Sequence, residues 1–598
     1  QASRDLWSFI PIYLGPILVF VFGWRLLGRM ILIAKREHIT SIADFIAARY
    51  GKAQTIGVLV TLICVAGVLP YIALQLKAIS SGLTILAPDL IARASLSDRQ
   101  LSLLVGIALS LFAILFGTRH IDATEHHRGV VLAIAFESLV KLVAFLGVGA
   151  GIVWLAAKQE IAWQWPTVTQ SLPTNFSSFA IHLLLAVSAV ICLPRQFHTT
   201  VVENSHPQDL HVARWVFPLY LLLMSLFVVP IALIGAAVLP GQVAADTYVI
   251  NLPLAFGHSG LALLAFLGGA SAAAGMVIVS SIALAIMVSN DLILPLLLRQ
   301  KRFSHRSYHQ FAGLLLNVRR LTIAVLFLLA WLCYLTIDPI PALAEIGYLS
   351  LSAVAQFMPA LIGGLYWRLG NRKGVYAGLC SGFLLWLLAL MAQTQLLAGT
   401  AETNILLRLV TPPAIPYLEH LSLADWGALL SLLVNSSLYI AFSLMTRASL
   451  SERLQAAGFT GVPVQEEDTQ TLYQSRVSVE ELETLVARFL GQFRARRAFM
   501  RFADQHQQIL TPSSLASADL IRHSERLLAG VFGASSARLV LSSALQGRDM
   551  QLEEVATIVD EASELFDFSR TLLQGAIEHI DLGLSVIDKQ LRLVAWNR

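Results

Sequence analysis

Long apolar runs alternate with short polar breaks over the first three quarters of the chain, and this pattern ends near residue 447. A helix that crosses a bilayer needs about 20 mostly apolar residues. The pattern predicts eleven such helices, at 9–34, 54–86, 100–118, 127–157, 178–194, 213–240, 259–289, 320–337, 345–368, 374–397 and 424–446. After residue 447, charged residues become more than twice as frequent, which is typical of a water-exposed region. The sequence therefore predicts an all-α membrane domain followed by a soluble region.

Composition supports a membrane protein and disfavours other classes. The mean hydropathy is +0.69, and hydrophobic residues make up 56% of the 598 residues, which is too apolar for a soluble chain of this length. A net charge of +4 gives no reason to expect nucleic acid as a partner. The four cysteines lie in apolar segments without a metal-ligand or disulfide spacing, so packing is their expected role.

Lys and Arg are divided unevenly between the two sets of loops that alternate along the chain. One set contains 17 of these residues and the other contains 4. The positive-inside rule places the richer set in the cytoplasm. The first helix then runs from outside to inside, and we expect the chain to emerge in the cytoplasm at residue 447.

Charged residues inside the apolar runs are candidates for function. Glu137 and Lys141 are spaced i, i+4, so they share one helix face and can pair. Such a pair is either a neutralised structural pair or part of a coupling-ion or proton relay. Lys77 lies deep in the second helix near Gln75, where it either lines a polar cavity or extends to an interface.

Four stretches carry a resemblance to a known family. They are the glycine-rich segment 356–382, the helix entry 42–51, the turn 193–198 and the segment 124–128. Together they resemble signatures of the sodium:solute symporter family over about residues 5–446. The resemblance implies a fold of two inverted repeats of five helices, with the first helix of repeat one missing from this chain. We therefore expect a fragment, truncated at both ends, that lacks part of its binding pocket.

The resemblance also implies substrate and ion residues. In amino-acid symporters of the family, the face that leads into the turn contacts substrate, and here that face is Ala189, Leu193 and Phe197. Ordinary packing is the alternative for all three. The expected substrate-binding set is Gln75, Lys77, Ala189, Leu193, Gln196 and Phe197.

The expected ion site departs from the family pattern. The family has adjacent hydroxyls as sodium ligands where this chain has Ser271 followed by Ala272. Because one hard oxygen donor is lost, protons are the alternative coupling ion. The expected coupling-ion set is Glu125, Glu137, Lys141, Ser271, Ser280 and Ser281, with Ser271 as the possible sodium ligand.

The region after residue 446 is expected to have four parts. These are a linker at 447–475, a small helical linking domain at 476–548, a coiled-coil signalling helix at 549–580 and the start of an α/β PAS domain at 581–598. Apolar residues at alternating +3 and +4 steps from Leu552 to Ile580 support a parallel dimer stalk. An amphipathic helix packed on its own domain is the alternative.

This order of parts resembles the transporter-fused sensor histidine kinases. The resemblance implies a protein of the bacterial inner membrane that binds an amino acid, with histidine as the best guess. It further implies kinase domains beyond residue 598, which would use ATP and Mg2+, and a cognate response regulator. No catalytic constellation or cofactor motif is found in the chain itself. The alternatives are a symporter with a regulatory tail and no kinase signalling, and an inactive transporter that anchors a kinase.

Overall fold

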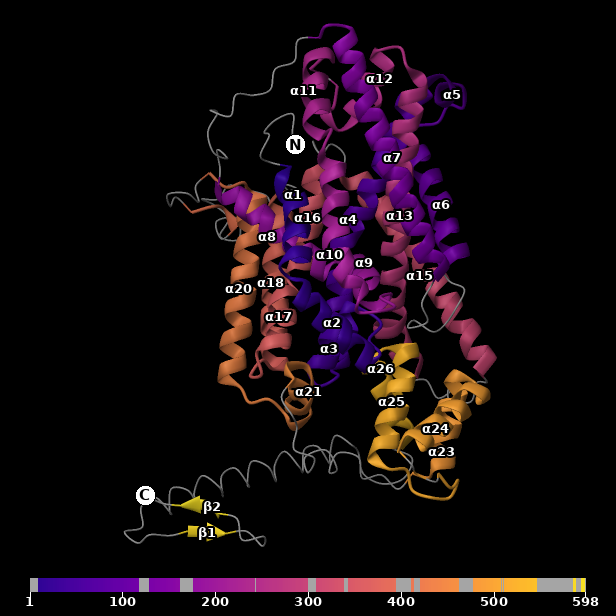
Figure 1. Cartoon of the computed structure of the whole chain (residues 1–598), viewed down its shortest axis with the longest axis vertical. Coiled ribbons are helices and arrows are strands. Elements are labelled where there is room, and N and C mark those ends of the chain that lie inside the picture. Colours follow the sequence, from indigo (N-terminus) through magenta and orange to yellow (C-terminus); the bar gives the residue numbers. More distant parts are fainter. Residues whose placement is uncertain are drawn as a thin grey trace.

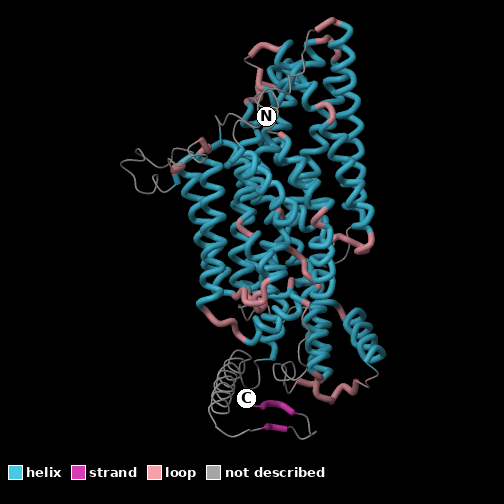
Figure 2. Tube along the Cα trace, turned by 60° about the vertical axis from the view of Figure 1, so that its left-hand side comes forward, coloured by secondary structure: helices cyan, strands magenta, loops and turns pink. Residues whose placement is uncertain are grey.

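A computed structural model describes residues 9–117, 128–161, 176–241, 243–298, 308–337, 343–393, 410–413, 420–461, 477–506, 508, 510–545, 585–587 and 593–596. The described part is almost entirely helical, with one short hairpin of strands near the end of the chain. Long helices run side by side, and a group of shorter helices lies at one end of them (Figures 1 and 2). The prediction of an all-α membrane protein is confirmed.

The membrane domain consists of the following elements. They are α1 (Ile10–Val21), α2 (Trp24–Glu37), α3 (Ile42–Arg49), α4 (Gln54–Leu86), α5 (Pro88–Arg93), α6 (Asp98–Gly117), α7 (Arg128–Lys158), α8 (Phe176–Cys192), α9 (Pro194–Phe197), the π-helix η1 (His198–Val202), α10 (Asp209–Ser225), α11 (Val228–Val238), the 3-10 helix η2 (Ala245–Thr247), α12 (Tyr248–Ala255), α13 (Ser259–Met287), the π-helix η3 (Val288–Ile293), α14 (Leu294–Leu298), α15 (Tyr308–Ile337), α16 (Leu343–Ala355), α17 (Met358–Tyr366), α18 (Arg372–Gln393) and α20 (Leu423–Met445).

The helices agree closely with the apolar runs of the sequence. Within the described residues, eight helices are long and apolar enough to cross a membrane, or up to ten if each of two bent pairs counts as one span. The bent pairs are α1 with α2, at 68°, and α8 with the segment Pro194–Val202, at 47°. The expected ninth span, 345–368, corresponds to the shorter helices α16 and α17.

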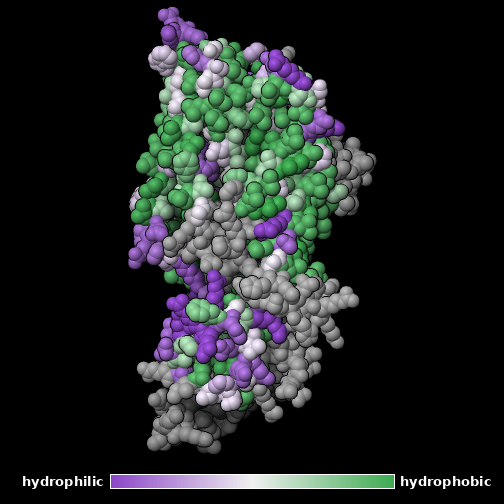
Figure 3. All heavy atoms as spheres, turned by 90° about the vertical axis from the view of Figure 1, so that its right-hand side faces the viewer, coloured by the Kyte–Doolittle hydropathy of each residue, from purple (hydrophilic) through white to green (hydrophobic). Residues whose placement is uncertain are grey.

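The surface of the helical bundle is apolar where lipid would cover it. Leu132, Phe136, Leu222 and Leu328 are large side chains that stay more than half exposed on α7, α10 and α15. Figure 3 shows hydrophobic side chains over most of this face and hydrophilic ones gathered on the shorter helices at one end. Since exposed apolar surface of this extent is unfavourable in water, it marks the part of the bundle that lies in the bilayer.

Helices α4 and α13 occupy the centre of the bundle. In each, 61% of the most apolar window is buried, against 11% for α7. Both helices are apolar along most of their length, and the larger share of each is covered by other helices. The centre of the membrane domain is therefore formed by α4 and α13, and their side chains determine what space is left there.

The glycine-rich segment 356–382 joins α18 to α20. A side-chain carbon added at Gly374, Gly378 or Gly382 would meet Ser443 or Asn435 of α20. Asn435 also donates hydrogen bonds to the backbone and side-chain oxygens of Gln356. Glycines at four-residue spacing allow close approach of two membrane helices, so this stretch has a packing role.

Residues 447–475, expected to be a linker, contain a docked helix. Helix α21 (Leu450–Thr460) begins at a side-chain cap from Ser449 and ends at Gly461 in the left-handed conformation. Phe459 is 1% exposed and packs edge-on against Phe45 of α3, with ring centroids 5.4 Å apart. The first part of this segment is therefore a packed element of the membrane domain, because it buries an aromatic side chain there.

Four short helices follow and form what we call the module. They are α23 (Val479–Leu490), α24 (Gln492–His506), α25 (Ala518–Phe532) and α26 (Ala534–Leu545). Helix α23 begins with a capping box between Ser478 and Glu481. Apolar residues such as Leu482, Phe499 and Leu528 are fully or nearly buried between these helices.

The last described residues form an antiparallel hairpin. Strand β1 (Ser585–Ile587) pairs with β2 (Leu593–Trp596), and Ser585 lies opposite Trp596. Both strands lie within 581–598, where the sequence predicts the start of an α/β domain. The expected coiled coil at 549–580 lies outside the described residues, and the PAS assignment stays a prediction.

Candidate functional site

Helix α8 breaks at Leu193, and this break shapes the site. Pro194 has no backbone N–H, so it cannot continue the hydrogen-bond ladder of α8. Leu193 adopts an extended conformation with ψ of 127°, and the chain bends by 47° there. Beyond the bend, Arg195 and Gln196 both border a cavity. Broken helices of this kind mark the solute sites of many transporters.

The cavity has a volume of about 710 Å³ and lies between α1, α4, α7, α8, α13 and α16. Small residues of α13, among them Gly268, Gly269 and Ala272, provide much of its space. Most of the other lining side chains are apolar, such as Phe145, Val190 and Leu351. A pocket of this size with few polar groups is typical of small-molecule sites.

Arg195 supplies a positive charge at the cavity wall. Its Nη1 donates a hydrogen bond of 2.9 Å to the Tyr71 hydroxyl, and its guanidinium lies 5.1 Å from the centre of the Tyr71 ring. The Tyr71 hydroxyl in turn donates to Met276 Sδ at 2.8 Å. A guanidinium has five N–H donors, and among the described residues Tyr71 is its hydrogen-bond partner. Arg195 is thus held in place with donors left for a ligand.

Other polar groups join Arg195 around the cavity. The side-chain amides of Gln75 and Gln196 border it and have no hydrogen-bond partner among the described residues. Lys141 also borders it and forms an ion pair of 3.5 Å with Glu137, whose side chain is 14% exposed. The lining also includes the acidic Asp246, so cationic, amide and acidic groups all border the apolar space. The guanidinium, the ammonium group and the amides are suited to binding a carboxylate on a partly apolar molecule.

The cavity brings together four of the six residues expected to bind substrate. Gln75, Ala189, Leu193 and Gln196 all border it. Phe197 does not, because the bend at Leu193 turns it away, and it is 1% exposed with its ring 5.5 Å from that of Phe45. Lys77 is also absent from the described lining. Their roles in binding stay predictions.

The residues expected to bind the coupling ion are more scattered. Lys141 borders the cavity, and a side-chain carbon added at Gly275 of α13 would collide with the carboxylate of its partner Glu137. Ser280 and Ser281 donate hydrogen bonds to carbonyl oxygens of their own helix, at 2.7 and 2.9 Å. Glu125 lies outside the described residues.

Ser271 of α13 is the residue that the sequence predicts as a possible sodium ligand. Sodium prefers a shell of several hard oxygen donors, but Ser271 lies between Ala270 and Ala272 on α13, which supply no side-chain oxygen. Within the described residues, no group of three His, Cys, Asp or Glu side chains is placed to hold a metal ion. The side chains next to Ser271 on α13 therefore do not make a sodium site with it, and the coupling ion stays a prediction.

Two functional candidates were missed by sequence reasoning. Arg195 stands inside the 193–198 turn, and a charged residue directly after a helix-breaking proline was an available signal. Asp291 lies at the end of the seventh apolar run and is 1% exposed. Its Oδ2 accepts a hydrogen bond of 2.9 Å from Thr61 of α4. An ionisable residue buried in a membrane helix is a candidate for function by default.

Comparisons with known proteins add one likeness. No protein-family model matches the chain, and no curated protein matches it. A solved structure of a Na+-coupled sialic acid symporter, in a substrate-bound outward-open state, is similar to this one with a TM-score of 0.41 and 14% sequence identity. The match covers 72% of this chain and 87% of that one.

Proposed function

We propose that the membrane domain binds a small solute that carries a carboxylate, and carries it across the bilayer. The observation that supports this most directly is the cavity of about 710 Å³ bordered by Arg195. A carboxylate accepts two parallel hydrogen bonds from a guanidinium, and such charge-assisted bonds are roughly twice as strong as neutral ones. The unpartnered amides of Gln75 and Gln196 are suited to a second polar group of the solute.

An amino acid is the solute class that this combination favours. Its carboxylate would meet Arg195, and its side chain would lie against the apolar wall of α8 and α13. Histidine is the first candidate, from the resemblance noted in the sequence. The coupling ion is Na+ or H+, and the Glu137–Lys141 pair next to the cavity supports the proton alternative.

The regions after α20 support a signalling role. We propose that the domain order is a symporter-like input domain, a linking module, a dimeric stalk and a PAS domain that precedes histidine kinase domains and their response regulator. The uneven distribution of Lys and Arg supports a cytoplasmic position for the module. A bacterial inner membrane belongs to the same proposal and rests on the resemblance noted in the sequence. A symporter with a regulatory tail is the second candidate, because the module contacts the membrane domain directly.

The test is ligand binding by the purified chain in nanodiscs. L-histidine and histamine form a matched pair, because histamine lacks only the carboxylate. We expect L-histidine, or another amino acid from a panel that also contains sialic acid, to bind at least tenfold more tightly than its decarboxylated analogue. Equal affinity for acid and amine would contradict carboxylate recognition. Uptake into proteoliposomes under a sodium gradient or a pH gradient then identifies the coupling ion.

A further inference from the structure

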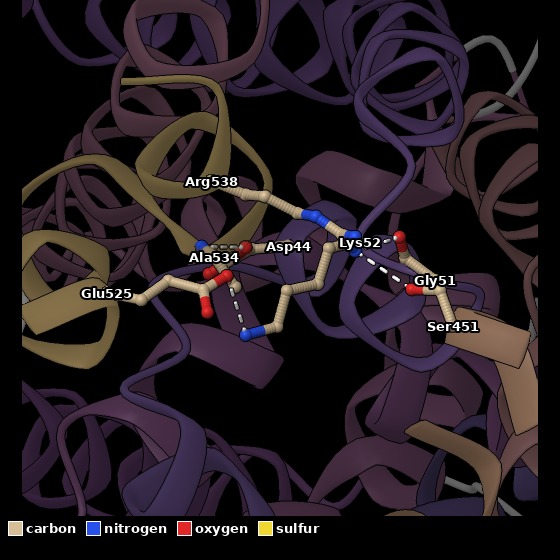
Figure 4. Close-up of polar contacts among 7 residues, drawn as sticks. All are labelled: Asp44, Gly51, Lys52, Ser451, Glu525, Ala534 and Arg538. Atoms are coloured by element: carbon tan, nitrogen blue, oxygen red, sulfur yellow. Dashed lines mark hydrogen bonds and ion pairs between the residues drawn. The ribbon is translucent and has the colours of Figure 1, made fainter. Parts of the chain in front are cut away.

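The module is attached to the membrane domain by a dense set of polar contacts. On the membrane side they involve Asp44, Gly51, Lys52, Asn290 and Ser451, which we call the docking surface. On the module side they involve Glu525 of α25 and Ala534, Ser536 and Arg538 of α26. Figure 4 shows most of these side chains converging from separate elements.

The N-terminus of α26 is seated on the carboxylate of Asp44. The backbone N–H of Ala534 donates a hydrogen bond of 2.5 Å to Asp44 Oδ1, and Asp44 is 1% exposed. The first N–H groups of a helix carry partial positive charge and attract an anion. Gly533 precedes them with φ of +82°, and a side-chain carbon there would lie 3.0 Å from the Asp44 carboxyl carbon. A residue of α3 therefore caps a helix of the module.

A buried ion pair adds to this contact. Lys52 Nζ and Glu525 Oε1 are 3.0 Å apart, with side chains 7% and 3% exposed. Nearby, Arg538 Nη1 donates to Gly51 O at 3.0 Å and to Ser451 Oγ at 2.9 Å. Because buried charges need well-placed partners, these contacts specify one position of the module on the membrane domain.

A further contact reaches a helix that lines the cavity. Ser536 Oγ donates a hydrogen bond of 2.6 Å to the backbone oxygen of Asn290. Asn290 belongs to the π-helical turn η3, which continues α13, and α13 borders the cavity through Met276 and its small residues. The next residue, Asp291, is bonded to Thr61 of α4, the helix that carries Gln75. The module thus touches α3 and the end of α13 at the same time.

We propose that α25 and α26 are a state-dependent clamp, which holds α3 against η3 and is loosened when solute binding moves these two elements apart. A hydrogen bond is lost within about an ångström of displacement, so a rigid module bonded to α3, η3 and α21 senses their relative positions. Transporter cycles move helices against one another around a central site. Signals from the cavity then reach the module through this surface, in addition to the covalent connection at 462–476.

Thermodynamic linkage gives the clamp a second consequence. If solute binding weakens docking by some factor, then release of the module strengthens solute binding by the same factor. Coupling between two sites in proteins typically amounts to about fivefold to 150-fold. The part of this inference that concerns solute affinity rests on the proposed function, whereas the part that concerns attachment of the module does not.

The experiment compares four forms of the chain in nanodiscs. They are the wild type, Glu525→Gln, the charge swap Lys52→Glu with Glu525→Lys, and the control Glu480→Gln, which alters an exposed glutamate of the module. Hydrogen exchange of the amides of α26 reports docking, and the Kd for L-histidine or the tightest panel member reports the cavity. Ser536→Ala, which removes a single contact, serves if Glu525→Gln does not fold.

We expect Glu525→Gln to raise amide exchange in α26 and to lower the solute Kd by about fivefold or more. The control should match the wild type, and the swap should return both values toward it. Saturating solute should raise exchange in α26 of the wild type by the same factor. Raised exchange with an unchanged Kd would overturn the clamp.

Failure of the proposed function is distinguishable from failure of the clamp. If no panel member binds the wild type, carboxylate binding is wrong, and the clamp is then tested with Ala189→Trp, which fills the cavity from α8. A change in α26 exchange in this variant would support communication between cavity and module. Unchanged exchange would overturn it.

Discussion

The cavity and the docking surface both contain charged residues, but they use their polar groups differently. At the docking surface, Lys52, Arg538 and the N–H of Ala534 each meet an oxygen of another element at 2.5–3.0 Å. Around the cavity, the amides of Gln75 and Gln196 have no hydrogen-bond partner among the described residues. The guanidinium of Arg195 is bonded there through one nitrogen.

This difference separates polar groups that the chain pairs with one another from polar groups that are left for a ligand. Leaving a buried donor unsatisfied costs about 1–3 kcal/mol, so donors persist unpaired where water or a ligand can reach them. At the docking surface, Lys52, Arg538 and the N–H of Ala534 are bonded within the chain and have little left to offer a ligand, although the side-chain amide nitrogen of Asn290 is buried there without a hydrogen-bond partner among the described residues. The cavity is accordingly suited to the proposed solute, whereas the docking surface binds the chain's own module.

The largest expected effect comes from breaking the buried ion pair. Lys52→Met should lower the free energy of opening of α25 and α26 by about 3–5 kcal/mol, because the Glu525 carboxylate stays buried without its cation. Native-state hydrogen exchange of both helices measures this. The control is Lys373→Met, since Lys373 is exposed. A loss of less than about 1 kcal/mol would show that the Lys52–Glu525 pair contributes no more to docking than a surface ion pair does.

The next effect concerns the cavity. Arg195→Gln should weaken carboxylate binding by about 10-fold to 100-fold, because it removes a charge-assisted hydrogen bond. Arg195→Lys should recover part of the affinity, since it restores the charge without the planar fork. Arg372→Gln is the matched control on an exposed arginine. Isothermal titration with the best panel member measures the change, and an unaltered Kd would remove Arg195 from the site.

A smaller effect sharpens the role of the α26 N-terminus. Gly533→Ala should destabilise docking by about 1–3 kcal/mol, because φ of +82° is strained for alanine and the added carbon meets Asp44. Gly313→Ala is the control, since nothing lies within 4 Å of a side-chain carbon there. Thermal unfolding in nanodiscs compares the two. Equal melting temperatures would argue against a strained, closely packed turn at Gly533.

The smallest expected effect is a pH dependence of docking. Burial lowers the pKa of His38 and of His523 from 6.5, and the charge of Arg526 lowers both further. Glu37 raises the pKa of His38. The neighbouring His38 and His506 lower the pKa of His523, and a hydrogen bond with the backbone of Ala498 raises it. The docked state then binds fewer protons than the open state below pH 6.5. Docking is therefore at full strength above pH 6.5 and weakens as the pH falls.

The expected slope is at most about 1.4 kcal/mol per pH unit for each histidine. Exchange rates of α26 amides, corrected for intrinsic pH dependence, measure it between pH 5 and 8. The double variant His38→Gln with His523→Gln should flatten the profile. A profile that stays steep in this variant would assign the dependence to other groups.

Much of the fold could be predicted because apolar runs report membrane spans directly. The run 54–86 coincides with α4 (Gln54–Leu86), and 424–446 with α20 (Leu423–Met445). The bend of 68° between α1 and α2 was not foreseen, since the residues at the bend, Phe22 and Gly23, include no proline. The sequence predicts a linker where α21 lies, because Gly458, Gly461, Pro463 and the acidic residues 466–468 are typical of a loop.

Only part of the site could be predicted from the sequence, and the reason is geometric. The spacing of Ala189, Leu193 and Phe197 assumes one straight helix, but the chain bends at Leu193 and brings Arg195 and Gln196 to the cavity instead. The docking surface had no local signal at all. Asp44 and Ala534 are 490 positions apart, and no spacing rule connects residues so distant in the sequence.

Helix α13 continues directly into η3, so a tilt at one end of this helix displaces the other end. Met276 at the cavity and Asn290 at the docking surface are separated by about 20 Å along the helix axis at about 1.5 Å per residue. A tilt of about 5° at the cavity end moves the far end by about 2 Å, which is enough to break a hydrogen bond of normal length. Because the helix is long, a tilt too small to alter the outline of the cavity is thus large enough at the far end to make or break the hydrogen bond between Ser536 and Asn290.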